Sequence, residues 1–272
     1  MVGHAEVAVG GATDKLRGYL DAVAIEADSE RSQVRRNVDP DGHTLPPVAD
    51  GTMSDAPDAT ESDWMPEGVP DEYASHVANA IRLRSGRKNA PPGESWNEQL
   101  NNPMPATAYI VDNRFLFVTD ARGRTVYVKA ILSQVKKTDG VDRRNEGQQL
   151  KAGTQYYDQL AQRRVDLDVP DRIKGVDDGG HIVASRFGGI GEAINLIAQN
   201  RKENRRRKNF DENWFGLENK VASLLAQLPD TPIDWTVELT YPDQSVRPRS
   251  LVATYTQGAA PPVTKRFKNP LE

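Results

Sequence analysis

The sequence predicts an α+β fold, and three features support that prediction: a meander, a hairpin and a helix. Residues 107–135 contain three apolar runs separated by the turn-forming sequences DNR and DARGR, which is typical of an antiparallel meander. Residues 234–242 and 247–258 are predicted to be two more strands that pair as a hairpin. Between the meander and this hairpin, residues 211–230 are predicted to form a helix with one apolar face, made by Leu217, Val221, Leu224, Leu225 and Leu228. Sheet, helices and sheet in this order indicate helices packed on an antiparallel sheet.

Further elements follow from spacing and composition. Asp211 is expected to cap the helix at 211–230, and Pro229 to end it. The remaining predicted elements are three helices and a short strand, at residues 13–37, 71–86, 146–164 and 193–200 respectively.

Three regions are predicted along the chain. Residues 1–37 contain the N-terminal helix, and residues 38–100 form an acidic, proline-rich linker with a short helix. The linker prediction rests on residues 38–72, which have too little apolar surface to offset the entropy of ordering. Residues 101–272 are left as the α+β domain.

Composition limits the classes of function. The chain has 272 residues and no cysteine, which excludes disulfides and thiolate metal sites. It lacks a run of about 18 apolar residues, so no membrane span is expected. The N-terminus does not have the pattern of a Sec signal, and any export is expected to use another route. Residues 1–80 carry a net charge of −11 and residues 81–272 one of +7. This asymmetry fits a nucleic-acid-binding domain and equally an acidic leader on a neutral domain.

The candidate chemistry lies in residues 177–218. Asp178, His181, Asn195, Asn204 and Glu218 follow one another there, and a strand–turn–strand–helix unit would gather them at one end. Phosphodiester cleavage needs a base near neutral pH, which an imidazole supplies. It also needs a divalent ion, and a hard ion is satisfied by an amide oxygen, a nearby carboxylate and water. Taken singly, however, the histidine is equally a turn residue and the glutamate a solvated helix position.

The order of several motifs resembles the DNA/RNA non-specific endonuclease family. Asp178-Gly-Gly-His181 is similar to the family's Asp-x-Gly-His tetrad. The stretch Asn195–Gln199 followed by Asn204, and then Trp214 with Glu218 four residues on, matches the later blocks. The resemblance covers roughly residues 107–269. It implies a ββα-metal (His-Me finger) core inserted in the antiparallel sheet with flanking helices, behind a helical and disordered N-terminal region.

The resemblance also implies roles for single residues. His181 would be the general base, and Asn204 the direct ligand of one Mg²⁺ or Mn²⁺ ion. Glu218 would act through the water around the metal, Asn195 would hold the histidine or the phosphate, and Asp178 would brace the turn that presents His181. The products would carry 5′-phosphate and 3′-hydroxyl ends.

Two assignments stay open at the level of sequence. Nine residues separate Asn204 from Trp214, more than in the family pattern, so Asn200 or Asn209 could be the metal ligand instead. The family's phosphate-clamping arginine has no match by motif, and its candidates are Arg143, Arg144, Lys151 and Arg172. Contacts to nucleic acid are expected from Arg186, Arg201, Arg205, Arg206 and Arg207, although residues 201–208 also fit an exposed basic loop.

The motif variants GGH and ASRFGG look like the branch found in bacterial polymorphic toxins. This predicts an antibacterial effector that leaves the cell by a non-Sec route, acts in the target-cell cytoplasm and has a cognate immunity protein. The alternatives are a cytoplasmic housekeeping or a nutritional nuclease, and a catalytically inactive nucleic-acid-binding module. A further possibility is that residues 1–90 dock a partner which defines specificity.

Overall fold

The computed structural model describes residues 64–88, 95–133, 144–207 and 212–271. These residues belong to one compact unit, Ser62–Glu272. The helix expected at 13–37 and about half of the predicted linker therefore lie outside the described residues. Residues 64–88 and 95–100 belong to the same unit as the sheet, so this unit begins earlier than the expected boundary at residue 101.

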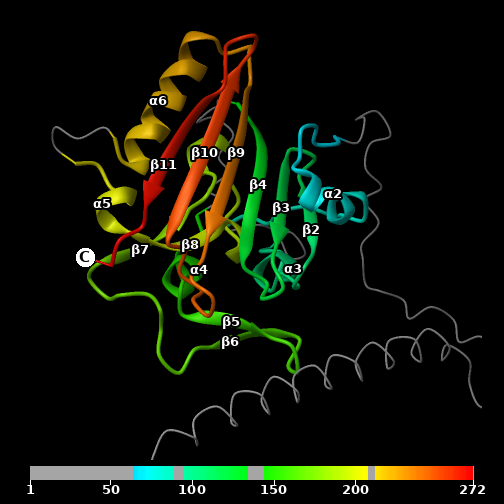
Figure 1. The fold of residues 1–272 in the computed structure, drawn as a ribbon, viewed down its shortest axis with the longest axis vertical. Helices are drawn as coiled ribbons and strands as arrows, with labels where there is room; N and C mark the ends of the chain where they lie inside the picture. Colours follow the sequence, from blue (N-terminus) through cyan, green and yellow to red (C-terminus); the bar gives the residue numbers. More distant parts are fainter. Residues whose placement is uncertain (1–63, 89–94, 134–143, 208–211, 272) are drawn as a thin grey trace, which may run out of the picture. The chain divides into compact units, whose positions relative to one another are not determined.

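A seven-stranded sheet is the centre of this unit (Figure 1). Its first strand pairs parallel to the second, and every other neighbouring pair is antiparallel. The predicted meander is confirmed as β2 to β4, and pairing of β4 with β9 joins it to the C-terminal strands. The strands, in sheet order, are β1 (Ile81–Leu83), β2 (Ala108–Val111), β3 (Phe115–Thr119), β4 (Thr125–Leu132), β9 (Ile233–Thr240), β10 (Ser250–Gln257) and β11 (Val263–Lys268).

Local chemistry accounts for the tight turn of the meander. The chain reverses between β2 and β3 over Asp112 and Asn113, whose φ angles are 53° and 50°. The Arg114 amide donates to the Val111 carbonyl at 3.2 Å and closes the turn. Two successive positive φ angles define a type I′ turn, which matches the strand twist and which Asp and Asn tolerate well.

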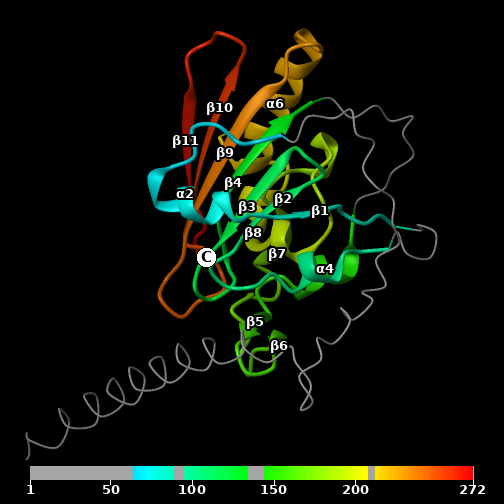
Figure 2. The same cartoon turned by 90° about the vertical axis from the view of Figure 1, so that its right-hand side faces the viewer.

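Both faces of the sheet are covered (Figures 1 and 2). Helix α6 (Trp214–Gln227) packs on one face, where the Trp214 ring lies 5.8 Å from Trp235 and 5.3 Å from Phe267. On the other face, α2 (Asp71–Ala78) contributes Val77 and Tyr73 to a second cluster with the alternate residues of β2 and β3. None of the helices in the described ranges is long and apolar enough to cross a membrane.

The site is built on smaller elements beside this sheet. Strands β7 (Asp177–His181) and β8 (Leu196–Asn200) form an antiparallel ribbon, and α5 (Arg201–Asn204) follows directly. With α6, this gives the predicted ββα arrangement. The other elements are α3 (Glu98–Asn101), α4 (Glu146–Lys151), the hairpin β5 (Gln155–Asp158) with β6 (Arg163–Asp166), and two short 3₁₀ turns at Ser185–Phe187 and Ala193–Asn195.

Several predicted elements need correction. The helix expected at 71–86 ends at Ala78, because the following residues pair with β2 as β1. The helix expected at 146–164 ends at Lys151, since Gly153 takes a φ of 76° and the next residues form the β5–β6 hairpin. Residues 193–195 form a 3₁₀ turn, so only 196–200 is strand.

The C-terminal part also differs from the prediction in two details. Helix α6 is capped by Asn213, whose side chain accepts a hydrogen bond from the Gly216 amide at 2.9 Å, and not by Asp211. The predicted hairpin is present as β9 and β10, but a third strand, β11, extends it.

Candidate active site

Two glycines allow the histidine strand to pack closely. A Cβ atom at Gly179 would lie 2.1 Å from the Gln149 carbonyl oxygen of α4. One at Gly180 would lie 2.0 Å from the side-chain oxygen of Gln199 on β8. Both distances are far inside van der Waals contact. The Gly-Gly pair therefore lets α4 and β8 close around β7, and His181 follows at the end of that strand.

The imidazole of His181 is held in a defined orientation. Its Nδ1 atom lies 3.3 Å from the side-chain nitrogen of Gln149. Its Nε2 atom is buried and has no hydrogen-bond partner among the described residues. Burial, together with the smaller effect of the positive charge of Arg144, lowers the pKa of His181 to about 4. The ring is therefore neutral at pH 7, the form that a general base requires.

A cavity of about 560 Å³ lies beside the end of β7. Its walls come from α4, β7, α5, α6 and the turn after β7. Four of the five predicted site residues line it, namely His181, Asp178, Asn204 and Glu218. Arg144, Arg172, Arg186 and Arg205 also line it, together with the carboxyl groups of Glu146, Asp178 and Glu218.

Glu218 is partly buried on α6 and faces this cavity. Desolvation raises the pKa of its carboxyl group to about 7, although the charge of Arg186 acts in the opposite direction. Arg186 itself donates to the Asn219 side-chain oxygen at 2.7 Å, and its guanidinium lies 5.7 Å from the Phe215 ring centre. Because ionisation of this carboxyl group is unfavourable in the buried site, a cation bound beside it would stabilise the carboxylate form.

The asparagines near residue 200 have different roles. Asn204 ends α5 and lines the cavity, and its amide nitrogen lies 3.4 Å from Asp178. Asn200 is buried, and its amide group is used internally: it accepts from the Lys202 amide at 2.7 Å and donates to the Pro270 carbonyl at 3.0 Å. The structure thus places Asn204, and not Asn200, at the cavity, whereas Asn209 lies outside the described residues.

A buried residue between these motifs fixes their relative position. The Asn213 side chain donates to the carbonyl of Lys202 at 2.7 Å and to that of Arg205 at 2.8 Å, while it caps α6. It therefore joins α5 to α6 across the insertion, that is, the nine residues between Asn204 and Trp214, and so brings Asn204 and Glu218 to one cavity. Its position just before the helix is the signal that sequence reasoning could have used.

Asp178 lies at the centre of an ion-pair cluster and does not brace the turn as expected. Its carboxylate accepts from Arg201 Nε at 2.9 Å and from Arg205 Nη2 at 2.7 Å. Desolvation alone would raise the pKa of Asp178, but hydrogen bonds from Arg205, Arg201 and Asn204 lower it overall. The carboxylate is thus ionised at neutral pH and holds α5 against β7.

Asn195 does not line the cavity, and its side chain bonds to the loop after His181. It is fully buried, and its side chain accepts from the Val183 amide and donates to the carbonyls of Val183 and Ile190, at 2.8–2.9 Å. The residue therefore holds the loop that follows the histidine, which positions His181 indirectly.

The predicted nucleic-acid contacts divide into two groups. Arg186 and Arg205 line the cavity, whereas Arg201 lies next to it and pairs with Asp178. Arg206 and Arg207 are exposed and do not line it.

The four candidates for the phosphate-clamping residue also differ in where they lie. Arg144 and Arg172 line the cavity, but Arg172 donates to the carbonyls of Gln149 and Leu150 at the end of α4. Lys151 lines a different cavity, and residue 143 lies outside the described residues.

A buried ion pair beside the site was not predicted from the sequence. Arg247 and Asp177 form a bidentate pair at 2.8 and 2.9 Å, and they are 4% and 1% exposed. Arg247 also donates to the carbonyls of Asn269 and Pro270. The pair joins the start of β7 to the C-terminal segment. Only the doubled aspartate before the glycines hinted at a structural partner for the first of them.

The donor set fits a hydrated hard cation. No cluster of three or more His, Cys, Asp or Glu side chains that could hold a metal occurs among the described residues. An ion here would therefore have few protein ligands, which suits an ion that keeps most of its water. The amide of Asn204 and the carboxylate of Glu218 are oxygen donors at the same cavity.

An α+β fold with a neutral imidazole, oxygen donors and arginines around one cavity has the groups that a nuclease needs. Residues 105–259 match the family model described as DNA/RNA non-specific endonuclease, and the chain belongs to this family. Its resemblance to that family in the motifs of the sequence is thereby confirmed.

Solved structures of nucleases are similar to this chain at low identity. One, described as the structure of Sda1 nuclease with bound zinc ion, is 16% identical with a TM-score of 0.44 and covers 57% of this chain and 76% of its own. An extracellular nuclease is 18% identical with a TM-score of 0.35, covering 54% and 78%. An extracellular endonuclease is 20% identical with a TM-score of 0.35, covering 55% and 74%.

Proposed function

We propose that the protein is a metal-dependent endonuclease that uses one Mg²⁺ or Mn²⁺ ion to cleave DNA, RNA or both, with little base selectivity. One observation carries the proposal: His181, Asn204 and Glu218 come from three different elements and line one cavity. A base, an amide oxygen and a carboxylate together meet the needs of phosphodiester hydrolysis.

The imidazole is proposed to accept the proton of the attacking water at Nδ1, after the water replaces the Gln149 amide group as the hydrogen-bond donor to the single lone pair of this atom. The Gln149 amide group can donate to this atom, while Nε2 is buried and carries the ring proton in the neutral form. The low pKa of His181 keeps Nδ1 unprotonated across the physiological range. Gln149 thereby orients the ring and selects its tautomer.

Asn204 and Glu218 would hold the ion, Asn204 directly and Glu218 through water. The ion, when bound, neutralises charge on the phosphate and on the leaving oxygen. Arg144 is proposed to clamp the phosphate, because it lines the cavity and its charge acts on His181. The expected products carry 5′-phosphate and 3′-hydroxyl ends.

Cleavage of plasmid DNA and of RNA by the full chain, with Mg²⁺ or with EDTA, tests this proposal. Wild-type protein should cleave with the ion and not with the chelator. His181→Ala should lose cleavage and keep the wild-type unfolding temperature, and retained activity would remove the general-base role. Asn204→Ala should require far more Mg²⁺; if Asn200→Ala has that effect and Asn204→Ala does not, the ligand assignment is wrong.

We also propose that the enzyme is an antibacterial toxin with an immunity protein, exported by a non-Sec route and active in the target-cell cytoplasm. The motif variants GGH and ASRFGG support this role. Expression of the wild-type chain in a bacterial cytoplasm should stop growth, and expression of His181→Ala should not. A small acidic protein encoded next to the gene should relieve the arrest; equal growth with both chains would favour a housekeeping role.

A further inference from the structure

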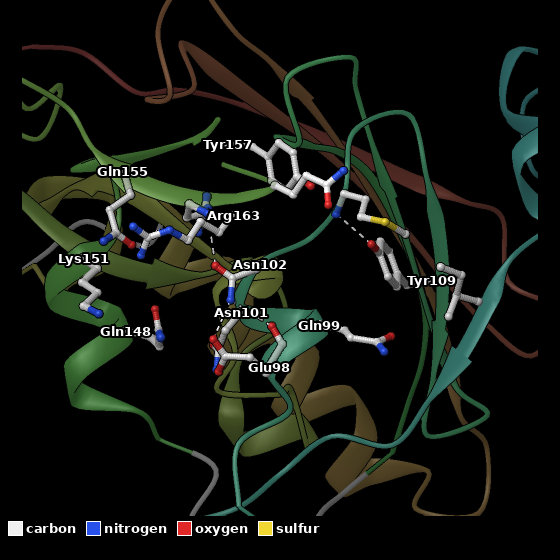
Figure 3. Close-up of a pocket in the computed structure, with 14 residues that line it drawn as sticks. Glu98, Gln99, Asn101, Asn102, Tyr109, Gln148, Lys151, Gln155, Tyr157 and Arg163 are labelled. Carbon is white, nitrogen blue, oxygen red and sulfur yellow. Dashed lines mark hydrogen bonds between the residues drawn. The ribbon is translucent and has the colours of Figure 1, made fainter. Parts of the chain in front are cut away.

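A second cavity, of about 990 Å³, lies on the opposite side of α4 from the catalytic one (Figure 3). Gln148 and Lys151 of this helix line it, whereas Gln149 and Leu150 line the catalytic cavity. Because an α-helix is about 10 Å across, the two cavities are separated by about one helix diameter. We call this second cavity the α4 cleft.

The α4 cleft is walled by α3 on one side and by the β5–β6 hairpin on the other. Figure 3 shows Lys151 and Gln148 from α4, and Tyr157, Gln155 and Arg163 from the hairpin, around the same space as Asn102. Asn102 accepts a hydrogen bond from the Arg164 amide at 3.2 Å and so joins the hairpin to α3. The walls are therefore held by internal contacts.

The cationic side chains of the cleft have no acidic partners in the described part of the chain. Lys151 and Arg163 are exposed and form no ion pair there. Arg164 is half-buried and likewise unpaired, and its Nε atom is buried without a hydrogen-bond partner. Burial lowers the pKa of Arg164. Buried charge without a partner is costly, and an anionic ligand would relieve that cost.

The rest of the lining is suited to nucleic acid. Glu98 is the one carboxylate among the lining residues, and its charge is engaged by the Asn102 side chain at 2.6 Å. Tyr157 offers an aromatic face that could stack on a base, a contact worth about 1–3 kcal/mol in single-strand-binding proteins. A cleft with three cations, neutral amides and an aromatic ring fits a sugar–phosphate strand better than an apolar ligand.

We propose that the α4 cleft is a second binding site for the nucleic-acid substrate. It holds a part of the strand that lies beyond the phosphate in the catalytic cavity. Lys151 and Arg163 contact its phosphates, Arg164 supplies positive charge from the wall, and α4 is the ridge over which the strand passes. This inference rests on the proposed nuclease function and adds that binding depends on substrate length.

The test compares a short and a long single-stranded oligonucleotide, of about 4 and about 16 nucleotides, with the full chain in EDTA. The double variant Lys151→Ala/Arg163→Ala should raise Kd for the long strand about three- to thirtyfold. Kd for the short strand should change less than about twofold, because that strand is held in the catalytic cavity. The slope of log K against log salt for the long strand should become shallower by about 1.4, since each phosphate contact contributes about 0.7.

Lys265→Ala/Arg266→Ala is the matched control. These two residues are exposed on β11, line neither cavity, and give the same change in net charge. The control should leave Kd for both strands within about twofold. If the alanine variant has a lowered unfolding temperature, Lys151→Gln/Arg163→Gln replaces it and should give the same length dependence.

An unchanged Kd and salt slope for the long strand would overturn the proposal, as would an equal loss for both strands. The same oligonucleotides with Mg²⁺ report on catalysis separately. Wild-type protein that binds in a length-dependent manner without cleaving either strand would refute the catalytic proposal alone. Wild-type protein that cleaves both strands, with KM for the long strand unaltered in the double variant, would refute only the role of the α4 cleft.

Discussion

Replacing Glu218 by glutamine should make the protein more stable and less active. Burial raises the pKa of Glu218 from 4.5 to about 7, so the folded protein holds a proton that the unfolded chain has released between these pH values. The stability of the folded state therefore falls as pH rises from about 4.5 to about 7, and the loss is complete above pH 7. Glutamine has no such loss, because it does not ionise.

The gain in stability expected for Glu218→Gln follows from the size of the pKa shift of Glu218. At about 1.4 kcal/mol for each pKa unit, the charged carboxylate costs about 3 kcal/mol at pH 8, or about 2–3 after allowing for its partial solvent contact. Glu218→Gln should therefore raise the unfolding temperature at pH 8 by about 4–10 °C in EDTA, and by little at pH 4. In the same variant, cleavage should fall, because glutamine lacks the negative charge that is proposed to hold the ion through water.

Thermal unfolding at pH 4 and pH 8, with Mg²⁺ and with EDTA, measures this directly. Mg²⁺ should raise the unfolding temperature of the wild type at pH 8 more than that of the variant, since the ion stabilises the ionised carboxylate. If the unfolding temperature of the variant rises equally at both pH values, or falls at pH 8, the explanation by burial is refuted. Unchanged activity in that variant would remove Glu218 from the site.

Three other substitutions test what positions the site. Asn195→Ala leaves the backbone groups of the loop after His181 unpaired, and urea unfolding should show a loss of about 3–5 kcal/mol; a loss below about 1 kcal/mol would contradict the role of its three hydrogen bonds. Arg247→Leu leaves the buried Asp177 carboxylate without its cation and should cost about 3–5 kcal/mol, whereas the exposed Arg249→Leu should stay within about 0.5. Gly179→Ala should lower the free energy of unfolding by about 1–3 kcal/mol and reduce cleavage by displacing α4. Gly147→Ala, within α4, should raise the free energy of unfolding by about 0.5–1 kcal/mol, because the atom nearest to the added Cβ is 3.5 Å away. Equal effects at the two glycines would disprove the close contact at Gly179.

The local sequence pattern was sufficient to predict the meander and α6. Three apolar runs with turn residues between them specify hairpins, and leucines at helical spacing specify a buried helical face, whatever the rest of the chain does. The same approach failed at residues 152–164, where polar residues of helical composition form β5 and β6 after a glycine with positive φ. It failed also at β1, which is a strand because it pairs with β2.

The candidate site shows the same division. The sequence by itself singled out His181 and Glu218, because their chemistry and order match the motifs of the family, and it left Asn200 and Asn209 as alternatives to Asn204. Only the tertiary structure decided that Asn195 holds a loop, that Asp178 binds Arg201 and Arg205, and that Asn213 ties α5 to α6 across the insertion. The physical reason is that such roles depend on which buried groups meet, and hydrogen bonds such as those from Arg247 to Asp177 join residues 70 positions apart. The spacing of residues along the chain does not indicate which of them come into contact in the folded protein, whereas the chemistry of an imidazole or a carboxylate follows from the residue type alone.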